Sequence, residues 1–165
     1  MSRSRDAALK AAKLARGNGA FLPFRLDVLR SPALASLSPF ASKLLLDIAS
    51  QWSMGKNGDA SVAFEKVLRV RGWRSKATLY KSLKELVASG LIIQTRQGSL
   101  HECSLYALGW LAIDDCGSKL DIKRTASPLD SWRKFEVDSN NSSSTPGVPM
   151  VLKKPHLSTP RVPDG

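Results

Sequence analysis

Residues 71–86 read RGWRSKATLYKSLKEL, and residues 90–98 continue as GLIIQTRQG. Ser75 is a residue type that caps helix N-termini, and Gly90 is the type that most often ends a helix in the left-handed conformation. The stretch therefore predicts a helix capped by Ser75 that runs to about Ser89. At about 100° per residue, one sector of this helix is apolar and is expected to face the core. Its members are Leu79, Leu83, Leu86 and Val87, with Tyr80 at the edge.

The opposite sector of this helix carries polar and charged side chains, which are not expected to be buried. It holds Arg74, Ala77, Thr78, Lys81 and Glu85, with Lys84 and Ser82 on its flanks. Arginine and lysine can donate to guanine edges or phosphates, threonine can bond a base edge, and alanine permits close approach to DNA. The alternative is a solvated helix face in which Lys81 and Glu85 form an ordinary i, i+4 pair.

The charge distribution favours a polyanionic partner. The 165 residues include 25 Lys plus Arg against 14 Asp plus Glu, a net charge of +11, which suggests nucleic acid before an acidic membrane. Residues 65–101 contain two acidic side chains, Glu65 and Glu85. The same window contains eight basic ones: Lys66, Arg69, Arg71, Arg74, Lys76, Lys81, Lys84 and Arg96.

Other elements can be placed on either side of this helix. Ser38 followed by Pro39 is a strong helix start, and an apolar stripe follows it: Phe40, Leu44, Leu45, Ile48 and Trp52. A helical turn is expected at 26–30, a short strand at 60–63, and a second helix that Gly72 ends before Trp73 enters the core. LIIQTR at 91–96 and CSLYALGW at 103–110 predict a hairpin, with 111–113 as a candidate extension of its second strand.

This order resembles the winged helix-turn-helix family over roughly residues 38–113. The most specific match is the Ser-capped third helix that closes on ELVASGLI at 85–92 and opens into a two-stranded wing. FLPFRLDVLRSPALASLS at 21–38 and SLYALGWLAID at 104–114 are similar to winged-helix proteins of bacterial plasmids, phages and integrated elements. The resemblance implies that the third helix enters the DNA major groove and that the wing touches the backbone or the minor groove.

The predicted interface combines base contacts and phosphate contacts, since the former specify a site and the latter position the protein. Arg74, Ala77, Thr78 and Lys81 are expected at base edges, and Lys84, Arg69, Arg71 and Arg96 at phosphates. The wing TRQGSLHE at 95–102 has Arg96, Gln97 and His101 as its polar reach. An ordinary hairpin turn is the alternative for the wing.

The expected fold class is α+β and mostly helical, a three-helix core with a two- or three-stranded wing. We expect a basic N-terminal arm at 1–19, which either follows phosphates or only aids solubility, and a winged-helix domain at 20–115. An extension at 116–135 is expected to have a short helix after Ser127-Pro128 that docks back or binds a partner, with Trp132 outside the domain. A Pro- and Ser-rich tail at 136–165 is expected to be disordered.

Several classes of function are not indicated. No phosphate-binding or dinucleotide-binding glycine motif occurs, and neither histidine has a nucleophile and carboxylate pattern, so we expect no enzyme. Cys103 and Cys116 form no paired motif, so we expect neither a disulfide framework nor a metal site, and a reducing cytoplasm fits best. No membrane span, cofactor or small-molecule ligand is predicted.

The function that these observations imply is binding of double-stranded DNA with some sequence preference, in the cytoplasm and associated with the nucleoid. Transcriptional regulation is the first expectation, and replication or partition of a plasmid or phage through origin repeats is the alternative. A third possibility is a winged helix that contacts another protein. One winged helix offers a small interface, so a homodimer or tandem binding on repeated half-sites is expected.

Overall fold

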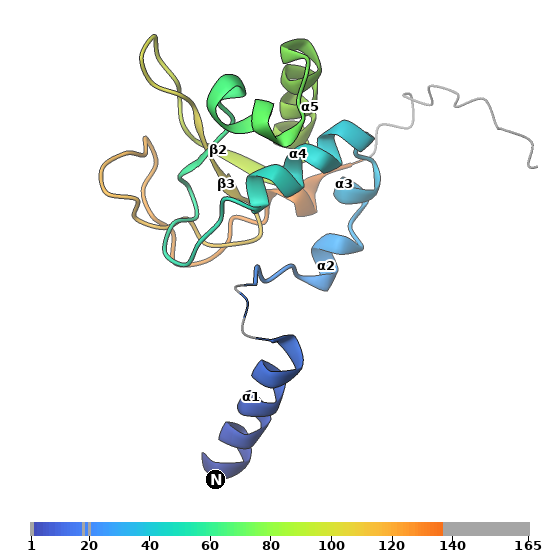
Figure 1. Ribbon diagram of the computed structural model, residues 1–165, viewed down its shortest axis with the longest axis vertical. Helices are drawn as coiled ribbons and strands as arrows, with labels where there is room; N and C mark the ends of the chain where they lie inside the picture. Colours follow the sequence, from blue (N-terminus) through green and yellow to red (C-terminus); the bar gives the residue numbers. More distant parts are fainter. Residues whose placement is uncertain (1, 18, 20, 137–165) are drawn as a thin grey trace, which may run out of the picture.

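The chain forms helices and three short strands in a computed structural model that describes residues 2–17, 19 and 21–136. The elements are α1 (Ser2–Arg16), α2 (Leu26–Leu29), α3 (Pro32–Ala35), α4 (Pro39–Ala49), β1 (Ala60–Ser61), η1 (Phe64–Leu68), η2 (Arg69–Arg71), α5 (Lys76–Ala88), β2 (Ile92–Arg96), β3 (Leu105–Leu108) and η3 (Ser131–Lys134) (Figure 1). The predicted α+β class is confirmed. The expected tail lies outside the described residues, apart from Glu136.

The three strands form one antiparallel sheet in the order β1-β3-β2. Ala60 pairs with Tyr106 of β3, and Ile92 of β2 pairs with Leu108 of β3. The β2–β3 register shifts between Gln94 and Arg96, which marks a bulge. The predicted hairpin is therefore confirmed, whereas 111–113 do not extend β3.

The predicted helix boundaries depend on caps that the structure contains. The Ser38 hydroxyl accepts from Ala41 N at 3.3 Å, and the Ser75 hydroxyl accepts from Thr78 N at 3.3 Å. Gly72 ends η2 with φ +86°, and Gly90 follows α5 with φ +70°, values that glycine adopts without steric cost. The second predicted helix is a single π-helical turn, η1, followed by the 3-10 turn η2.

The core forms where α4 and α5 pack on each other and on the sheet. The fully buried side chains include Leu44, Ile48, Leu86, Leu91, Ile92, Leu108 and Trp110, and Trp73 is 4% exposed, as predicted. Three apolar side chains expected in the core are instead exposed, namely Phe40 (57%), Tyr80 (64%) and Val87 (41%). They lie at the edges of their stripes, where no neighbouring element covers them.

The extension after β3 packs back on the domain, so Trp132 does not lie outside it. Asp130 N donates to Gly109 O at 3.2 Å, and Trp132 belongs to the core with 5% exposure. A Cβ atom on Gly90 would lie 2.6 Å from Trp132 N, so this close approach requires glycine. Pro128 does not begin a helix, because the short helix is the 3-10 turn η3 at Ser131–Lys134.

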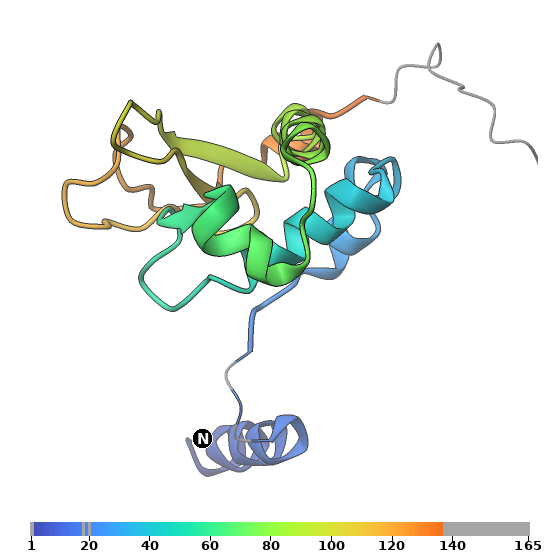
Figure 2. The same ribbon diagram turned by 45° about the horizontal axis from the view of Figure 1, so that its top comes forward.

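A cluster of opposite charges joins the start of α2 to η3. Arg25 donates to Asp130 at 3.2 Å, and Arg133 pairs with Asp27. Burial of the Asp130 carboxyl opposes its ionisation, but hydrogen bonds from Arg133 and Trp132 lower its pKa below the usual value. By contrast, α1 stands apart from the rest of the molecule in both ribbon views (Figures 1 and 2). No helix in the described part of the chain combines the length and apolar character that crossing a bilayer requires.

Candidate nucleic-acid interface

The side of α5 that faces away from the core is cationic. We call Arg74, Ala77, Tyr80, Lys81 and Lys84 the outer face; all five side chains are exposed. Thr78 is half-buried on the α4 side of the helix. The observed outer face is therefore rotated about the α5 axis toward the hairpin, relative to the predicted sector. It gains Tyr80 and loses Thr78. The position of Tyr80 at the edge of the apolar stripe was the signal that this residue could be exposed.

Glu85 does not belong to this surface, which corrects the predicted sector. Its carboxylate accepts hydrogen bonds from Ser38 N and from Ser38 Oγ, the latter at 2.7 Å. Glu85 thus joins the last turn of α5 to the start of α4, and it is not paired with Lys81. The carboxylate of Glu85 is therefore bound by Ser38 and does not pair with the cations of the outer face.

The carboxylate of Glu65 is also bound by neighbouring side chains. Arg69 donates to it at 2.7 Å, and Lys76 lies 3.4 Å from its other carboxylate oxygen. The hydrogen bond from Arg69, together with that from Lys76, lowers the pKa of the Glu65 carboxyl. Arg69 and Lys76 keep more than half of their side-chain surface exposed (68% and 63%), so both still present charge to solvent.

Asp47 organises the turn that precedes α5. Its carboxylate accepts from Trp73 Nε1 and from Lys43 Nζ, each at 2.7 Å, and from Arg71 Nη1 at 3.2 Å. Burial raises the pKa of this carboxyl, but the hydrogen bonds from Lys43 and Trp73 outweigh that effect and lower it. Arg71, predicted at a phosphate, is therefore held against α4 with 39% of its side chain exposed.

A hollow of about 530 Å³ lies at the start of α5. It is lined by Arg69, Arg74 and Lys76, with Phe64 and Trp73 as apolar walls. Lys76 Nζ lies 5.5 Å from the centre of the Phe64 ring, a cation–π distance. Three cations therefore meet beside the N-terminus of α5, where a helix dipole favours a negative charge.

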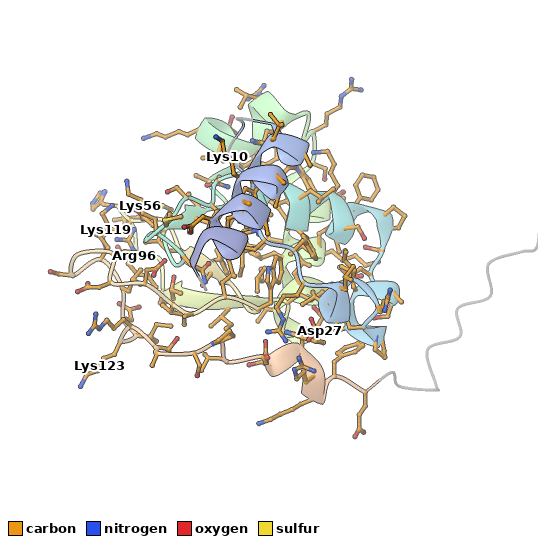
Figure 3. The ribbon with its side chains drawn as sticks, turned by 90° about the horizontal axis from the view of Figure 1, so that it is seen from below. Lys10, Asp27, Lys56, Arg96, Lys119 and Lys123 are labelled. Carbon is orange, nitrogen blue, oxygen red and sulfur yellow. The ribbon has the colours of Figure 1, made fainter. Side chains whose placement is uncertain are left out.

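The hairpin loop, residues 97–104, projects on the same side of the molecule as α5 (Figure 1). Arg96, predicted at a phosphate, is 16% exposed and donates to Cys103 O from Nε and Nη2 at 3.2 and 2.9 Å. It lies at the same end of the molecule as Lys56 and Lys119 (Figure 3). Gln97 accepts from Gln94 Nε2 at 2.7 Å. These two side chains thus bind the hairpin itself.

A groove of about 720 Å³ separates α5 from the hairpin loop, and Figure 2, which looks nearly along α5, shows the two apart. Its floor and walls include Phe64, Leu79, Tyr80, Leu83 and Tyr106, and its rim is formed by residues 97–104. Burial raises the pKa of the Tyr106 hydroxyl. The groove therefore lies between the cationic helix α5 and a hairpin loop whose residues 97–104 include no lysine or arginine.

The arrangement brings together most of the predicted helix residues but separates them from Arg71, Arg96 and Gln97, which form internal contacts. Sequence reasoning missed Asp47 and Glu85 as organising groups because most of their partners come from other elements: Arg71 and Trp73 for Asp47, and Ser38 for Glu85. Chemically, the outer face can donate hydrogen bonds and present positive charge to a polyanion. A comparison of the chain with protein-family models, curated proteins and solved structures finds no match.

Proposed function

We propose that this chain is a winged helix-turn-helix protein that binds double-stranded DNA with sequence preference, using α5 in the major groove and the hairpin loop as the wing. One observation supports this most: the side chains of Arg74, Lys81 and Lys84 make no ion pair or hydrogen bond with any residue that the structure describes. The nearby carboxylates of Glu65, Glu85 and Asp47 are all engaged elsewhere. The fold therefore leaves an uncompensated cationic helix face.

The arrangement of elements agrees with this proposal. The order α4, β1, η1, η2, α5, β2, β3 follows the order of helices and strands expected from the sequence, and the three strands form one antiparallel sheet. Arg74, Ala77, Tyr80 and Lys81 are placed at base edges in this proposal, and Lys84, Arg69 and Lys76 at phosphates. Thr78 is a base contact only if the helix enters the groove with its α4 side.

The test begins with selection of duplexes from a random-sequence library by the purified chain, followed by measurement of affinity against salt. We expect Lys84→Ala to reduce the salt slope by about 1, because this lysine releases counterions from one phosphate. Arg74→Ala should cost about 1–3 kcal/mol on the selected site and relax specificity there.

The matched control is Lys56→Ala, which removes an exposed lysine from the loop at 53–59, far from α5 (Figure 1). It should leave both affinity and slope unchanged. The proposal is wrong if the chain binds no duplex, or if the α5 variants and Lys56→Ala behave alike. Mapping of the bound sites then separates two roles: promoters would indicate a regulator, which we favour, and an array of repeats at an origin would indicate replication or partition.

A further inference from the structure

The tip of the hairpin loop ends in an apolar side chain. Leu100 is 91% exposed, more than any other exposed large apolar side chain in the described part of the chain. It lines the outer rim of the groove between α5 and the loop. An apolar side chain this exposed contributes nothing to the core, so it is available for contact with a partner, and the structure of the loop decides whether it is presented in a fixed position.

The loop holds Leu100 in a defined position. Ser99 N donates to Glu102 O at 2.9 Å, which leaves Leu100 and His101 as a two-residue tip. Below the tip, Gly98 N donates to Ser104 Oγ at 2.9 Å, and a Cβ atom on Gly98 would lie 2.8 Å from Ser104 N. Glycine therefore lets the two limbs of the loop approach closely. The tip is narrow because both limbs are bound to each other.

The same bonds remove positive charge from the tip. Arg96 is turned along the hairpin toward Cys103 O and lies 3.9 Å from Glu102. Residues 97–104 contain no Lys or Arg, while Glu102 is exposed. A loop with this composition is poorly suited to grip phosphates. The loop is better suited to place an apolar side chain against the bases of a DNA groove than against the phosphates of the DNA backbone.

We propose that Leu100 is a wedge that enters the DNA minor groove beside the major groove occupied by α5, partly unstacks one base step and bends the duplex. Apolar side chains such as leucine and methionine act in this way in proteins that kink DNA. The cationic outer face of α5 supplies the attraction that brings the duplex against the tip, which is the charge complementarity that identifies the partner as DNA. The proposal rests on the proposed function and adds a bend to it.

The test measures DNA bending separately from DNA binding. The probe is a duplex of about 30 base pairs that carries a selected site with a flexible pyrimidine–purine step and a fluorophore at each end. With the full chain we expect energy transfer to rise on binding. Leu100→Ala should lose at least half of that rise while its affinity falls by less than about tenfold. Leu100→Met, which keeps a long apolar side chain, should retain the bend.

The control is Met54→Ala, which removes an equally exposed apolar side chain (89%) from the loop at 53–59. It should bend the duplex like the unchanged chain. The wedge is wrong if the unchanged chain binds the duplex without bending it, or if Leu100→Ala bends it fully. It is also wrong if Leu100→Ala instead lowers the sedimentation mass of the free protein, because the tip then contacts a second copy. Absence of any binding would refute the proposed function itself.

Discussion

Asp47 shows how one side chain can fix the position of a whole turn. Its carboxylate joins Lys43 on α4 to Trp73 and Arg71 in the turn before α5. The side chain is 10% exposed, so its charge is tolerated only because three donors surround it. Without those donors, a buried carboxylate would destabilise the turn. Asp47 therefore sets where the first residues of α5 begin.

Replacement of Asp47 by Asn should destabilise the chain by about 1.5–3 kcal/mol at neutral pH, since the charge-assisted hydrogen bonds from Lys43, Arg71 and the buried Trp73 are lost. The pKa of Asp47 is lowered in the folded protein. Its contribution is therefore present above the unfolded-chain value of about 3.9 and is lost as the pH falls through the lower folded value. Urea unfolding of both proteins at pH 7 and in the acid range measures this.

The control for that experiment is Asp115→Asn, because Asp115 is exposed and accepts only from Gly117 N at 3.1 Å among the described residues. It should change the free energy of unfolding by less than about 0.5 kcal/mol. Equal losses for the two substitutions, or a difference that persists unchanged in acid, would contradict the role given to Asp47.

At the scale of elements, α4 and α5 are joined by a polar contact at one end and by leucines along their length. Glu85 of α5 accepts two hydrogen bonds from Ser38, the N-cap of α4. The carboxylate also lies where the dipole of α4 favours negative charge. This contact fixes the crossing of the two helices and hence the direction of the outer face.

Glu85→Ala should therefore destabilise the chain by about 1–2 kcal/mol, the range for loss of a capping interaction. Lys81→Ala is the matched control in the same helix and should leave stability within about 0.5 kcal/mol. Thermal unfolding followed by circular dichroism measures both. If Lys81→Ala were as destabilising as Glu85→Ala, an i, i+4 pair within α5 would explain the stability better.

The caps and breaks of these elements could be predicted from the sequence because they depend on neighbours in the chain. Ser38, Ser75, Gly72 and Gly90 act within one helical turn of where they stand. The position of Tyr80 at the edge of the apolar stripe indicated exposure, but the exposure of Val87 could not be predicted, because a helical wheel gives the direction of a side chain but not what covers it. Glu85 was misplaced for the same reason, since its partner lies 47 positions away.

At the scale of the whole molecule, the extension after β3 completes the core. Trp132 is 5% exposed, its indole donates to Asp130 at 3.1 Å, and Arg133 stacks 4.5 Å from its ring centre. The sequence placed this tryptophan outside the domain because nothing local indicates that Trp132 lies against Gly90 or that Asp130 bonds to Gly109. The close approach of backbones at those glycines is a long-range feature of packing.

Trp132→Ala should cost about 3–5 kcal/mol of stability, the usual range for loss of a buried aromatic side chain. Leu129→Ala, a half-exposed neighbour in the same segment, should cost less than about 1 kcal/mol. Urea unfolding followed by far-ultraviolet circular dichroism compares them without relying on tryptophan emission. Equal stabilities would show that the segment unfolds independently of the rest.

The ion pairs of Arg25 with Asp130 and of Arg133 with Asp27 have a topological consequence. The chain enters the packed region and leaves it at neighbouring points, on the side away from the hairpin tip. A domain with neighbouring ends of this kind can be inserted into an exposed loop of another protein. Its two junctions would then meet at one spot, and α5 would remain uncovered.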